Sequence, residues 1–477
     1  MTIRRVIPLL LMLSVGRVFA QIAPPLPDRP WHPPSERQIE DDAKHLRESG
    51  FSVEPDKIYS LAELVDFAEE HNPETRVAWE IARAQVAALG VARSELYPTV
   101  AAVALSQIDR EEAPFGSQFY RQTQQTFAGT IELNYTILDF GARAGRIAAA
   151  RATLLTANFA FNDTHRKIIY QVAQTYYRLL NALGQEDAAR ASLTNAQTAQ
   201  QAAEDRLIHG LATLPDVLEA RSATAQAQYD LQSALGAEEI AGGDLATALG
   251  TRPTVTIHVQ PIDQLSIPES IGDSVDQAID HAFDQRPDLM EQIAEIRRAN
   301  AGVKEARAAY YPTLTLSASP SAQSLYILQQ ALPWGHTADL GGGLSVNLGW
   351  TLFDGGARKN NLAKAEANVR AAEAQVNASR DQIADEVWGA YSNVKTALRQ
   401  RQAAIALLEA ASQSYAAALE SYNYGVRSFL DVTAAQRTLA QARSTDVLAR
   451  TQVLTNLANL AFRTASLMQS GSRKAKP

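Results

Sequence analysis

Two short stretches of the chain repeat one pattern of a glycine, a hydroxyl residue and an aspartate. The residues are Gly210, Thr213 and Asp216 in the first stretch and Gly425, Ser428 and Asp431 in the second. A glycine that ends one helix, followed by a hydroxyl cap and an acid three residues later, is typical of a tight turn between two helices. Pro215 suits the first turn of the second helix. Each stretch is therefore predicted to be a helix tip that carries an aspartate.

The two tips differ in residues that bind carboxylates. Tyr422 and Arg427 occur in the second stretch, where the first has a leucine and an alanine. A guanidinium beside Asp216 or Asp431 forms charge-assisted hydrogen bonds. Such bonds would hold neighbouring helix pairs together at the tips.

Other chemistry has little support in the sequence. The chain has no cysteine, which excludes disulfides, thiol nucleophiles and cysteine-based metal sites. The eight histidines lack the spacing of metal ligands. The glycine run at 341–343 is not followed by the helix start that a phosphate-binding loop requires. We expect no metal, no cofactor and no enzymatic activity, and the net charge of −8 argues against nucleic acid as a partner.

The N-terminal residues indicate export. Arg4 and Arg5 precede a short apolar run that ends at small residues near Ala20, which is typical of a secretory signal peptide over residues 1–20. A proline-rich segment covers residues 21–56, and residues 470–477 form a polar tail. No later stretch has the length and apolarity of a membrane-spanning helix, so any insertion into a membrane must use strands.

The rest of the chain contains an internal duplication. Tyr97-Pro98-Thr99 recurs as Tyr311-Pro312-Thr313, and later motifs follow at a nearly constant offset of about 215 residues. We expect repeat 1 over residues 57–260, with a hairpin at 96–138 and a tip near 210. Repeat 2 covers residues 261–469, with a hairpin at 310–353 and a tip near 425.

In each repeat, the spacing of the apolar residues changes from two to seven in the same order along the chain. Apolar and polar residues first alternate, as in strands with one apolar face. The hairpin ends at 109–121 and 323–336 are expected to be exposed loops. A spacing of seven follows, as in a coiled coil. The seam of repeat 2 is Leu362, Val369, Val376, Ile383, Ala390, Ala397 and Ala404. From residue 141 to about residue 208, the first such helix spans on the order of 100 Å.

Four strands per chain cannot close a membrane barrel. Aromatic residues at the strand ends suit a membrane interface, namely Tyr97, Tyr135, Tyr311 and Trp350. Open strand edges in hydrocarbon cost several kcal/mol per unpaired group, so several chains must share their strands. The polar strand faces then line a pore. A dimer, a trimer or a tetramer could each share strands in this way.

The duplicated motifs resemble those of the TolC-like outer-membrane efflux proteins. The carriers are the Tyr-Pro strand entries, the Asp-x-Gly segments that begin at Asp139 and Asp354, and the two tips. The resemblance covers residues 61–467. It implies an α+β membrane protein in the Gram-negative outer membrane, a homotrimer with a long coiled-coil helical barrel in the periplasm and a jointly formed transmembrane β-barrel.

The resemblance also implies function and partners. The channel would be the passive exit duct of a tripartite efflux or type I secretion system, joined to a periplasmic adaptor protein and an inner-membrane RND or ABC pump. Asp431 would belong to an aspartate ring, and Asp216, Tyr422 and Arg427 to a latch. Ala434 stands where the family carries a second ring aspartate. The residues implied in tip turns and adaptor docking are Gly210, Leu211, Thr213, Gly425, Val426 and Ser428.

The main alternative is a structural coiled-coil protein of the periplasm or a pump adaptor. An adaptor would carry barrel-like and lipoyl-like domains around one helical hairpin. It would not repeat a strand hairpin within a full-length duplication. The sequence does not identify the substrate, the pump or the adaptor.

Overall fold

The computed structural model describes residues 39, 41–42, 57–115, 117–272, 274–329 and 333–466. The predicted signal peptide, nearly all of the proline-rich segment 21–56 and the tail 470–477 lie outside these residues. The chain divides into a unit from Met1 to Ser52 and a unit from Val53 to Pro477. Everything described below belongs to the second unit.

The helices of the two halves have the same lengths. Each half contains helices of 11, 22, 67 and 35 residues, in that order. In the first half they are α2 (Leu61–His71), α3 (Pro73–Ser94), α4 (Ala142–Ile208) and α5 (Leu214–Ala248). In the second half they are α6 (Val275–Gln285), α7 (Pro287–Ala308), α8 (Ala357–Asn423) and α9 (Phe429–Arg463), with a 3-10 helix, η1, at Ile262–Gln264.

Local sequence signals fix where these helices begin. Ser60 forms a capping box with Glu63 at the start of α2, and the Asn72 side chain caps α3, in which Pro73 is the first residue. The first long helix, α4, follows Gly141, whose φ of 102° favours glycine. The Asp139 carboxylate accepts hydrogen bonds from the backbone N–H groups of Gly141, at 3.3 Å, and of Arg143, at 2.7 Å. Asp354 does the same before α8.

Residues spaced by seven form the buried seam of α8, with Val376 and Ile383 packed against α6 and α7 and alanines farther along. Val376, Ile383 and Ala390 are buried on α8, as are Ala397 and Ala404 farther along the same seam. The helix α9 packs against both α8 and α4, and α4 packs against α5 and α7. Burial of a continuous stripe of small residues lets the helices approach closely and stabilises their parallel alignment.

The main sheet has six strand segments. They are β2 (Thr99–Phe115), β3 (Gln118–Leu138), β5 (Thr313–Ala318), β6 (Ser321–Gln329), β7 (Gly335–Gly341) and β8 (Leu344–Gly349). The long strand β3 pairs with β2 on one edge and with β5 and β6 on the other. The outer strands β8 and β7 pair with β5 and β6, so β2 and the β7/β8 pair are the open edges of the described sheet.

The hairpins differ from the sequence prediction in two respects. Residues 109–115 and 118–121 of the first hairpin, and 323–329 and 335–336 of the second, are paired strands rather than loops. The backbone ladders continue to the Phe115–Gln118 pair and to the Ile327–Gly335 pair whatever the side chains are. Both strands of the second hairpin are interrupted. Pro320 separates β5 from β6, and a Cβ on Gly342, between β7 and β8, would lie 2.9 Å from the Pro320 Cα.

The paired register gives the sheet one apolar and one polar face. Phe127, Ile131 and Leu133 alternate with Thr126, Thr130 and Glu132 along β3. Leu316 and Val346, which are paired on β5 and β8, continue the apolar face beside Tyr135 of β3. Many of these apolar side chains are exposed on the single chain. This face therefore lacks its partner in one subunit.

A small second sheet was not anticipated from the sequence. The strand β1 (Ile58–Tyr59) pairs in parallel with β4 (His258–Val259). The two strands cover a hydrophobic core that includes Tyr176, Leu180 and Leu245, all fully buried or nearly so. The connection between the halves is thereby attached to the middle of α4 and to the C-terminal end of α5.

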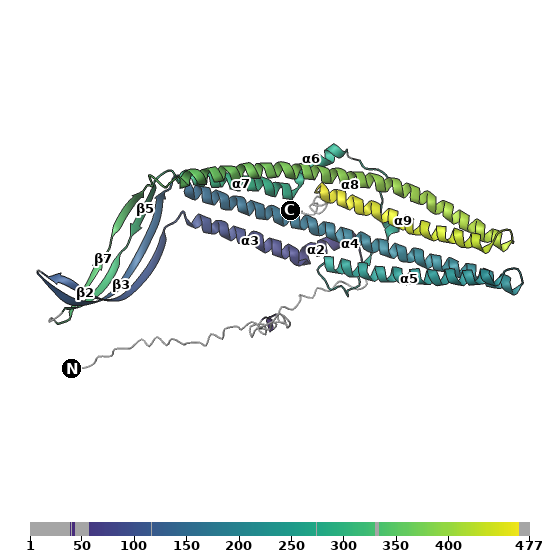
Figure 1. The fold of residues 1–477 in the computed structure, drawn as a ribbon, viewed down its shortest axis with the longest axis horizontal. Helices are drawn as coiled ribbons and strands as arrows, with labels where there is room; N and C mark the ends of the chain where they lie inside the picture. Colours follow the sequence, from purple (N-terminus) through teal and green to yellow (C-terminus); the bar gives the residue numbers. More distant parts are fainter. Residues whose placement is uncertain are drawn as a thin grey trace. The chain divides into compact units, whose positions relative to one another are not determined.

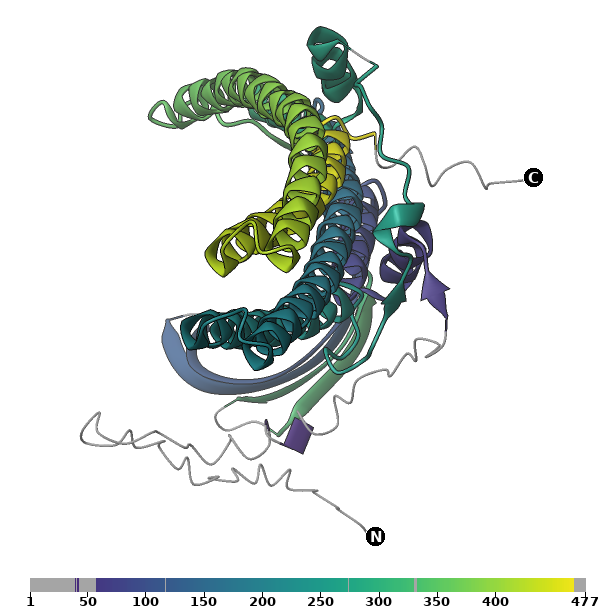
Figure 2. The ribbon, with the colours of Figure 1, turned by 90° about the vertical axis from the view of Figure 1, so that its right-hand side faces the viewer.

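Within the unit from Val53 to Pro477, the main sheet lies at one end of the helices and the two helix tips at the other (Figure 1). Viewed along the helices, the long helices form a curved layer with an open side (Figure 2). Among the described helices, none combines the length and apolarity needed to cross a bilayer.

Candidate functional site at the helix tips

The first tip is a glycine turn followed by a capped helix. Gly210 has a φ of 74°, and the Leu211 N–H donates to the Arg206 carbonyl at 2.8 Å, which ends α4. The Asp216 carboxylate then accepts from the Thr213 N–H at 2.9 Å and from the Thr213 hydroxyl at 2.8 Å. The cap predicted from the sequence is present.

The second tip has the same geometry. Gly425 has a φ of 76°, and the Val426 N–H donates to the Ser421 carbonyl at 2.9 Å. The Asp431 carboxylate accepts from the Ser428 N–H at 3.2 Å and from its hydroxyl at 3.0 Å. Because only one oxygen of each aspartate is used in the cap, both carboxylates keep an oxygen for other contacts at the tip.

One arginine joins the two tips. Arg206, in the last turn of α4, donates to the Asn423 carbonyl at the end of α8, at 2.8 Å, and to the Leu211 carbonyl of its own tip, at 3.3 Å. Its guanidinium also lies over the Tyr422 ring, 4.8 Å from the centroid. Arg206 thus fastens the α4/α5 pair to the α8/α9 pair.

Tyr422 lies beneath this guanidinium inside the chain. Its side chain is buried and packs edge-on against Phe429 at 5.3 Å. Burial, helped by the nearby Asp216 carboxylate and opposed by Arg206, raises the pKa of the Tyr422 phenol. The phenol therefore stays neutral, and its ring belongs to the core that also contains Val217 and Val432.

Arg427 occupies a different position from Tyr422. Its side chain is exposed, and among the described residues it has no hydrogen bond or ion pair. Within one chain the structure therefore does not bring Arg427 onto Asp216 or Asp431. Arg206, which the sequence interpretation missed, makes the connection between tips. Its signal in the sequence is weak, since it is one of many arginines in α4.

Apolar side chains surround the tip turns. Leu211, Leu214 and Val426 are largely exposed, as are Tyr424 and Leu430. Exposed apolar groups at a capped helix end form a surface suited to a partner helix. The candidate docking residues at 210–213 and 425–428 therefore lie together at the free end of the helices.

The aromatic candidates lie at the opposite end. Tyr97 and Tyr311 are more than half exposed, and Tyr311 stacks on Phe140 with ring centroids 5.1 Å apart. The Trp350 indole N–H donates to the Tyr310 carbonyl at 3.1 Å. Tyr135 is partly covered by Arg143, which lies 5.9 Å from its ring centroid. All four candidates are thus placed where the strands meet the helices.

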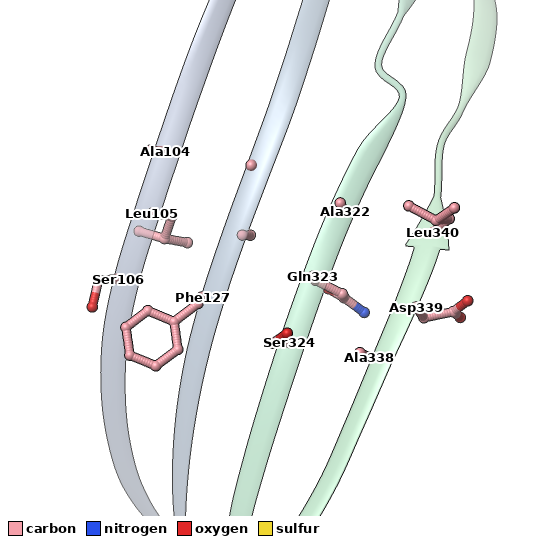
Figure 3. Close-up of a pocket in the computed structure, with 12 residues that line it drawn as sticks. Ala104, Leu105, Ser106, Phe127, Ala322, Gln323, Ser324, Ala338, Asp339 and Leu340 are labelled. Atoms are coloured by element: carbon pink, nitrogen blue, oxygen red, sulfur yellow. The ribbon is translucent and has the colours of Figure 1, made fainter. Parts of the chain in front are cut away.

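A shallow depression of about 760 Å³ lies on the sheet, between β2, β3, β6 and β7 (Figure 3). Its lining includes Leu105, Phe127 and Leu340, and Asp339 is the only ionisable residue among those that line it. No group of histidine, aspartate or glutamate residues in the described part of the chain is arranged to hold a metal ion. The depression follows the sheet, and small and apolar side chains make up most of its lining.

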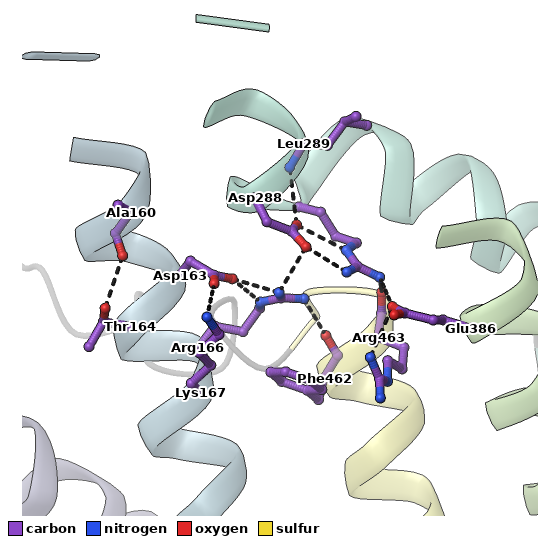
Figure 4. A network of polar contacts seen from close by, with 11 residues as sticks. Ala160, Asp163, Thr164, Arg166, Lys167, Asp288, Leu289, Glu386, Phe462 and Arg463 are labelled. Atoms are coloured by element: carbon purple, nitrogen blue, oxygen red, sulfur yellow. Dashed lines mark hydrogen bonds and ion pairs between the residues drawn. The ribbon is translucent and has the colours of Figure 1, made fainter. Parts of the chain in front are cut away.

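A buried ionic network ties the middle of the helices together (Figure 4). Arg166 donates to Asp163 at 2.6 Å and to the Phe462 carbonyl at 3.0 Å, and it lies 3.4 Å from Asp288. Arg286 bridges Asp288, at 2.6 Å, and Glu386, at 2.8 Å.

This network satisfies the C-terminal end of α9. The Phe462 carbonyl accepts from Arg166, and the Thr464 carbonyl contacts the His281 imidazole at 2.9 Å. The last carbonyls of a helix lack partners within the helix, and cations near them are stabilising. The ion pairs therefore attach the end of the second helix pair to α4 and to the start of α7.

The family of the chain follows from its match to a family model. The family model described as outer membrane efflux protein matches residues 64–251 and 278–465, which is most of the chain. The chain belongs to the outer membrane efflux protein family. As a member of this family, it is an efflux channel of the Gram-negative outer membrane that extends into the periplasm. The predicted family, function and location are thereby confirmed.

Individual relatives agree over most of their length. Protein CyaE of Bordetella pertussis is 28% identical over 400 residues, which cover 83% of this chain and 82% of that protein. The cation efflux system protein CusC of Escherichia coli K12 is 24% identical over 344 residues, covering 68% and 69%. The open-state structure of the MtrE outer membrane channel of Neisseria gonorrhoeae aligns with a TM-score of 0.69 at 20% identity, covering 85% and 88%. This last likeness shows a shared fold.

Proposed function

We propose that three copies of this efflux protein assemble head to tail into a closed ring that forms a passive exit duct. The observation that carries this proposal is that each side of the single chain is open. On one side lie the edge strand β2 and the helices α3 and α5, and on the other lie the β7/β8 edge and α8.

The two open sides differ from each other, so in a ring one side of each copy contacts the opposite side of the next copy. A head-to-tail interface closes into a ring when the rotation between copies is right, and the curved layer of helices in Figure 2 supplies such a rotation. Joining β2 of one copy to β8 of the next leaves no unpaired strand edge in the membrane. Three copies, the number implied by the family resemblance, then share a β-barrel and continue it as a helical tunnel.

The polar face of the sheet is the natural lining of such a barrel. Glu132 and Asn134 lie on this face of β3, with Ser317 and Asn347 on the strands beyond. The opposite face, with Ile131 and Val346, then contacts lipid. The matching helix lengths of the two halves support an origin by duplication. Each half supplies one strand hairpin and one long helix pair to the same ring.

The helix tips are proposed as the periplasmic gate and the site of adaptor docking. Arg206 supports a latch within each subunit, and Asp431 supports a carboxylate ring where the tips of sister copies converge. Relatives of the chain include cation, antibiotic and toluene efflux proteins. A tripartite assembly with a periplasmic adaptor and an inner-membrane RND or ABC pump therefore suits this chain.

Disulfide cross-linking tests the ring. The natural chain has no cysteine, so pairs can be introduced freely, for example Ala101→Cys on β2 with Ser345→Cys, Asn347→Cys or Gly349→Cys in turn on β8. Chains with both cysteines are expected to form covalent dimers and trimers on oxidation, while each single-cysteine chain stays monomeric in SDS. Covalent dimers from a single-cysteine chain would indicate a two-fold interface and contradict the head-to-tail ring.

A further inference from the structure

Nine basic and five acidic residues lie where the helices meet the sheet, in segments 85–98, 139–151, 299–312 and 350–366. This band is positive, although the chain as a whole has a net charge of −8. All four segments adjoin the aromatic residues at the strand ends. The excess of positive charge is therefore concentrated at one level of the molecule.

Every carboxylate of the band is already paired. The pairs are Asp139 with Arg143, Glu95 and Glu305 with Arg146, Asp354 with Arg358, and Glu366 with Arg307, at distances of 2.6 to 3.5 Å. Hydrogen bonds to the charged carboxylate outweigh the opposing effect of burial and lower the pKa values of Asp139 and Asp354, so both remain ionised at neutral pH.

Five basic side chains of the band are left over. We call these residues the basic collar: Arg93, Arg151, Lys304, Lys359 and Lys364. All five are exposed, and none of the five side chains has a hydrogen bond or an ion pair with any residue that the structure describes. A sister copy in a ring brings the same excess of basic residues in this band, so the band stays positive in an assembly.

The collar lies just beyond the apolar face of the sheet. Arg93 and Lys359 are within three residues of a sheet-side helix end, and Lys304 is within one turn. Arg151 and Lys364 are the farthest, about 13 Å and about 10 Å along their helices at 1.5 Å per residue. Long basic side chains extend toward a membrane interface while their stems stay on the protein. Aromatic residues next to the collar mark that interface.

We propose that the basic collar binds the phosphate groups of anionic phospholipids in the leaflet nearest the helices. Guanidinium and ammonium groups bind phosphate oxygens through charge-assisted hydrogen bonds, and unpaired cations at a membrane surface attract anionic lipid. The collar would hold the channel at a fixed depth and select a shell of anionic lipid around it. This proposal rests on the location of the chain in a membrane, which its family establishes. It does not depend on the proposed role of the helix tips as a gate.

Lipid exchange tests the proposal with matched variants of one helix. The intact protein is purified in detergent, and binding of spin-labelled phosphatidylglycerol and phosphatidylcholine is measured for wild type, K359Q/K364Q and K395Q/R399Q. Lys395 and Arg399 are exposed basic residues farther along α8, so both variants lose the same charge. The collar variant should lose up to about fivefold in phosphatidylglycerol binding for each cation removed, with phosphatidylcholine binding unchanged.

Three outcomes would overturn the proposal. They are equal binding of the two lipids by wild type, equal loss in both variants, and full displacement of phosphatidylglycerol by inorganic phosphate at matched charge, which would indicate a free-anion site. The proposal is supported if K395Q/R399Q keeps the preference for phosphatidylglycerol over phosphatidylcholine and K359Q/K364Q loses it. Higher salt should then weaken this preference in the wild type. Unboiled migration as an oligomer shows in parallel that each variant is assembled.

Discussion

Arg206 is the residue on which the gate proposal depends most. Its guanidinium contacts both tips and the Tyr422 ring, whereas the Arg427 side chain has no hydrogen bond or ion pair among the described residues of its own chain. A hydrogen bond to a charged group contributes about 2 kcal/mol when its partners are otherwise unsatisfied. Loss of Arg206 should therefore loosen one helix pair against the other without unfolding either pair.

The Arg206→Ala variant tests this latch. We expect an intact oligomer with higher single-channel conductance in planar bilayers, because the tips separate more easily. Arg221→Ala is the control, since Arg221 pairs with Glu204 inside one helix pair, at 2.9 Å, and does not join the two pairs. Unchanged conductance in Arg206→Ala, beside a wild type that does form channels, would contradict the latch but not the channel.

Asp431 carries a separate prediction about ion selectivity. Because Ala434 replaces a second acid, one carboxylate per subunit would focus the field at the constriction, and cation preference should be modest. Asp431→Asn keeps an oxygen for the helix cap and removes the charge. Reversal potentials in asymmetric salt should show a fall in cation preference. A strong preference that survives this substitution would exclude Asp431 from the ring.

At the scale of the elements, the buried network at the end of α9 determines how the second helix pair is attached. Arg286 is almost fully buried and joins Asp288 to Glu386. Removing one partner of a buried ion network leaves an uncompensated charge, which costs about 3 kcal/mol. Exposed pairs contribute much less.

Arg286→Leu should accordingly lower the free energy of unfolding by about 3 kcal/mol. Arg298→Leu is the matched control, because Arg298 forms a more exposed pair with Glu295 within the helix α7 and should change stability by about 0.5 kcal/mol. Urea unfolding in detergent, followed by circular dichroism, measures both. Equal effects of the two substitutions would mean that the network does not hold α9.

The same network predicts a dependence on acid. Burial alone would raise the pKa values of Asp288 and Glu386, but Arg286 and its neighbours outweigh burial and lower both. A carboxyl with a lowered folded pKa stabilises above its unfolded pKa, near 3.8 for Asp288 and 4.5 for Glu386, and this contribution is lost as pH falls through the folded pKa. Stability should be constant near neutrality and fall below about pH 4, less steeply in Arg286→Leu.

At the scale of the whole molecule, the open sides account for the exposed apolar surface. Val77 and Ile81, one turn apart on α3, are both more than half exposed and have no cover within the chain. Such a face suits a sister subunit. The proposed ring covers it and closes the strand edges with the same contact.

The double variant Val77→Asp/Ile81→Asp should weaken the ring. Two carboxylates at an apolar interface lose their hydration, so assembly should fall while the helices persist. The measurement is the fraction of oligomer in unboiled gels and by light scattering. Arg76→Asp/Arg83→Asp, on the exposed Arg–Trp79 surface of the same helix, is the control. Undiminished oligomer in the first variant would place the interface elsewhere.

Much of this architecture was predictable from the chain alone. Alternating and seven-residue periods report which face of a strand or helix is buried, and the glycine and capping residues at 210–216 and 425–431 act through contacts only a few residues away. Such local physics does not depend on the rest of the fold. The helix tips, the strand entries and the outer-membrane efflux family therefore followed from residue order.

Only the tertiary structure decided which distant residues meet. Arg206 lies 217 positions from its acceptor Asn423, and Arg166 lies 296 positions from the carbonyl it caps. Nothing in their immediate sequence separates them from other arginines. The β1–β4 pairing and the interrupted strands β5/β6 and β7/β8 likewise depend on partners brought together by packing. Contacts across such separations are set by the register of long helices and strands, which short-range patterns do not specify.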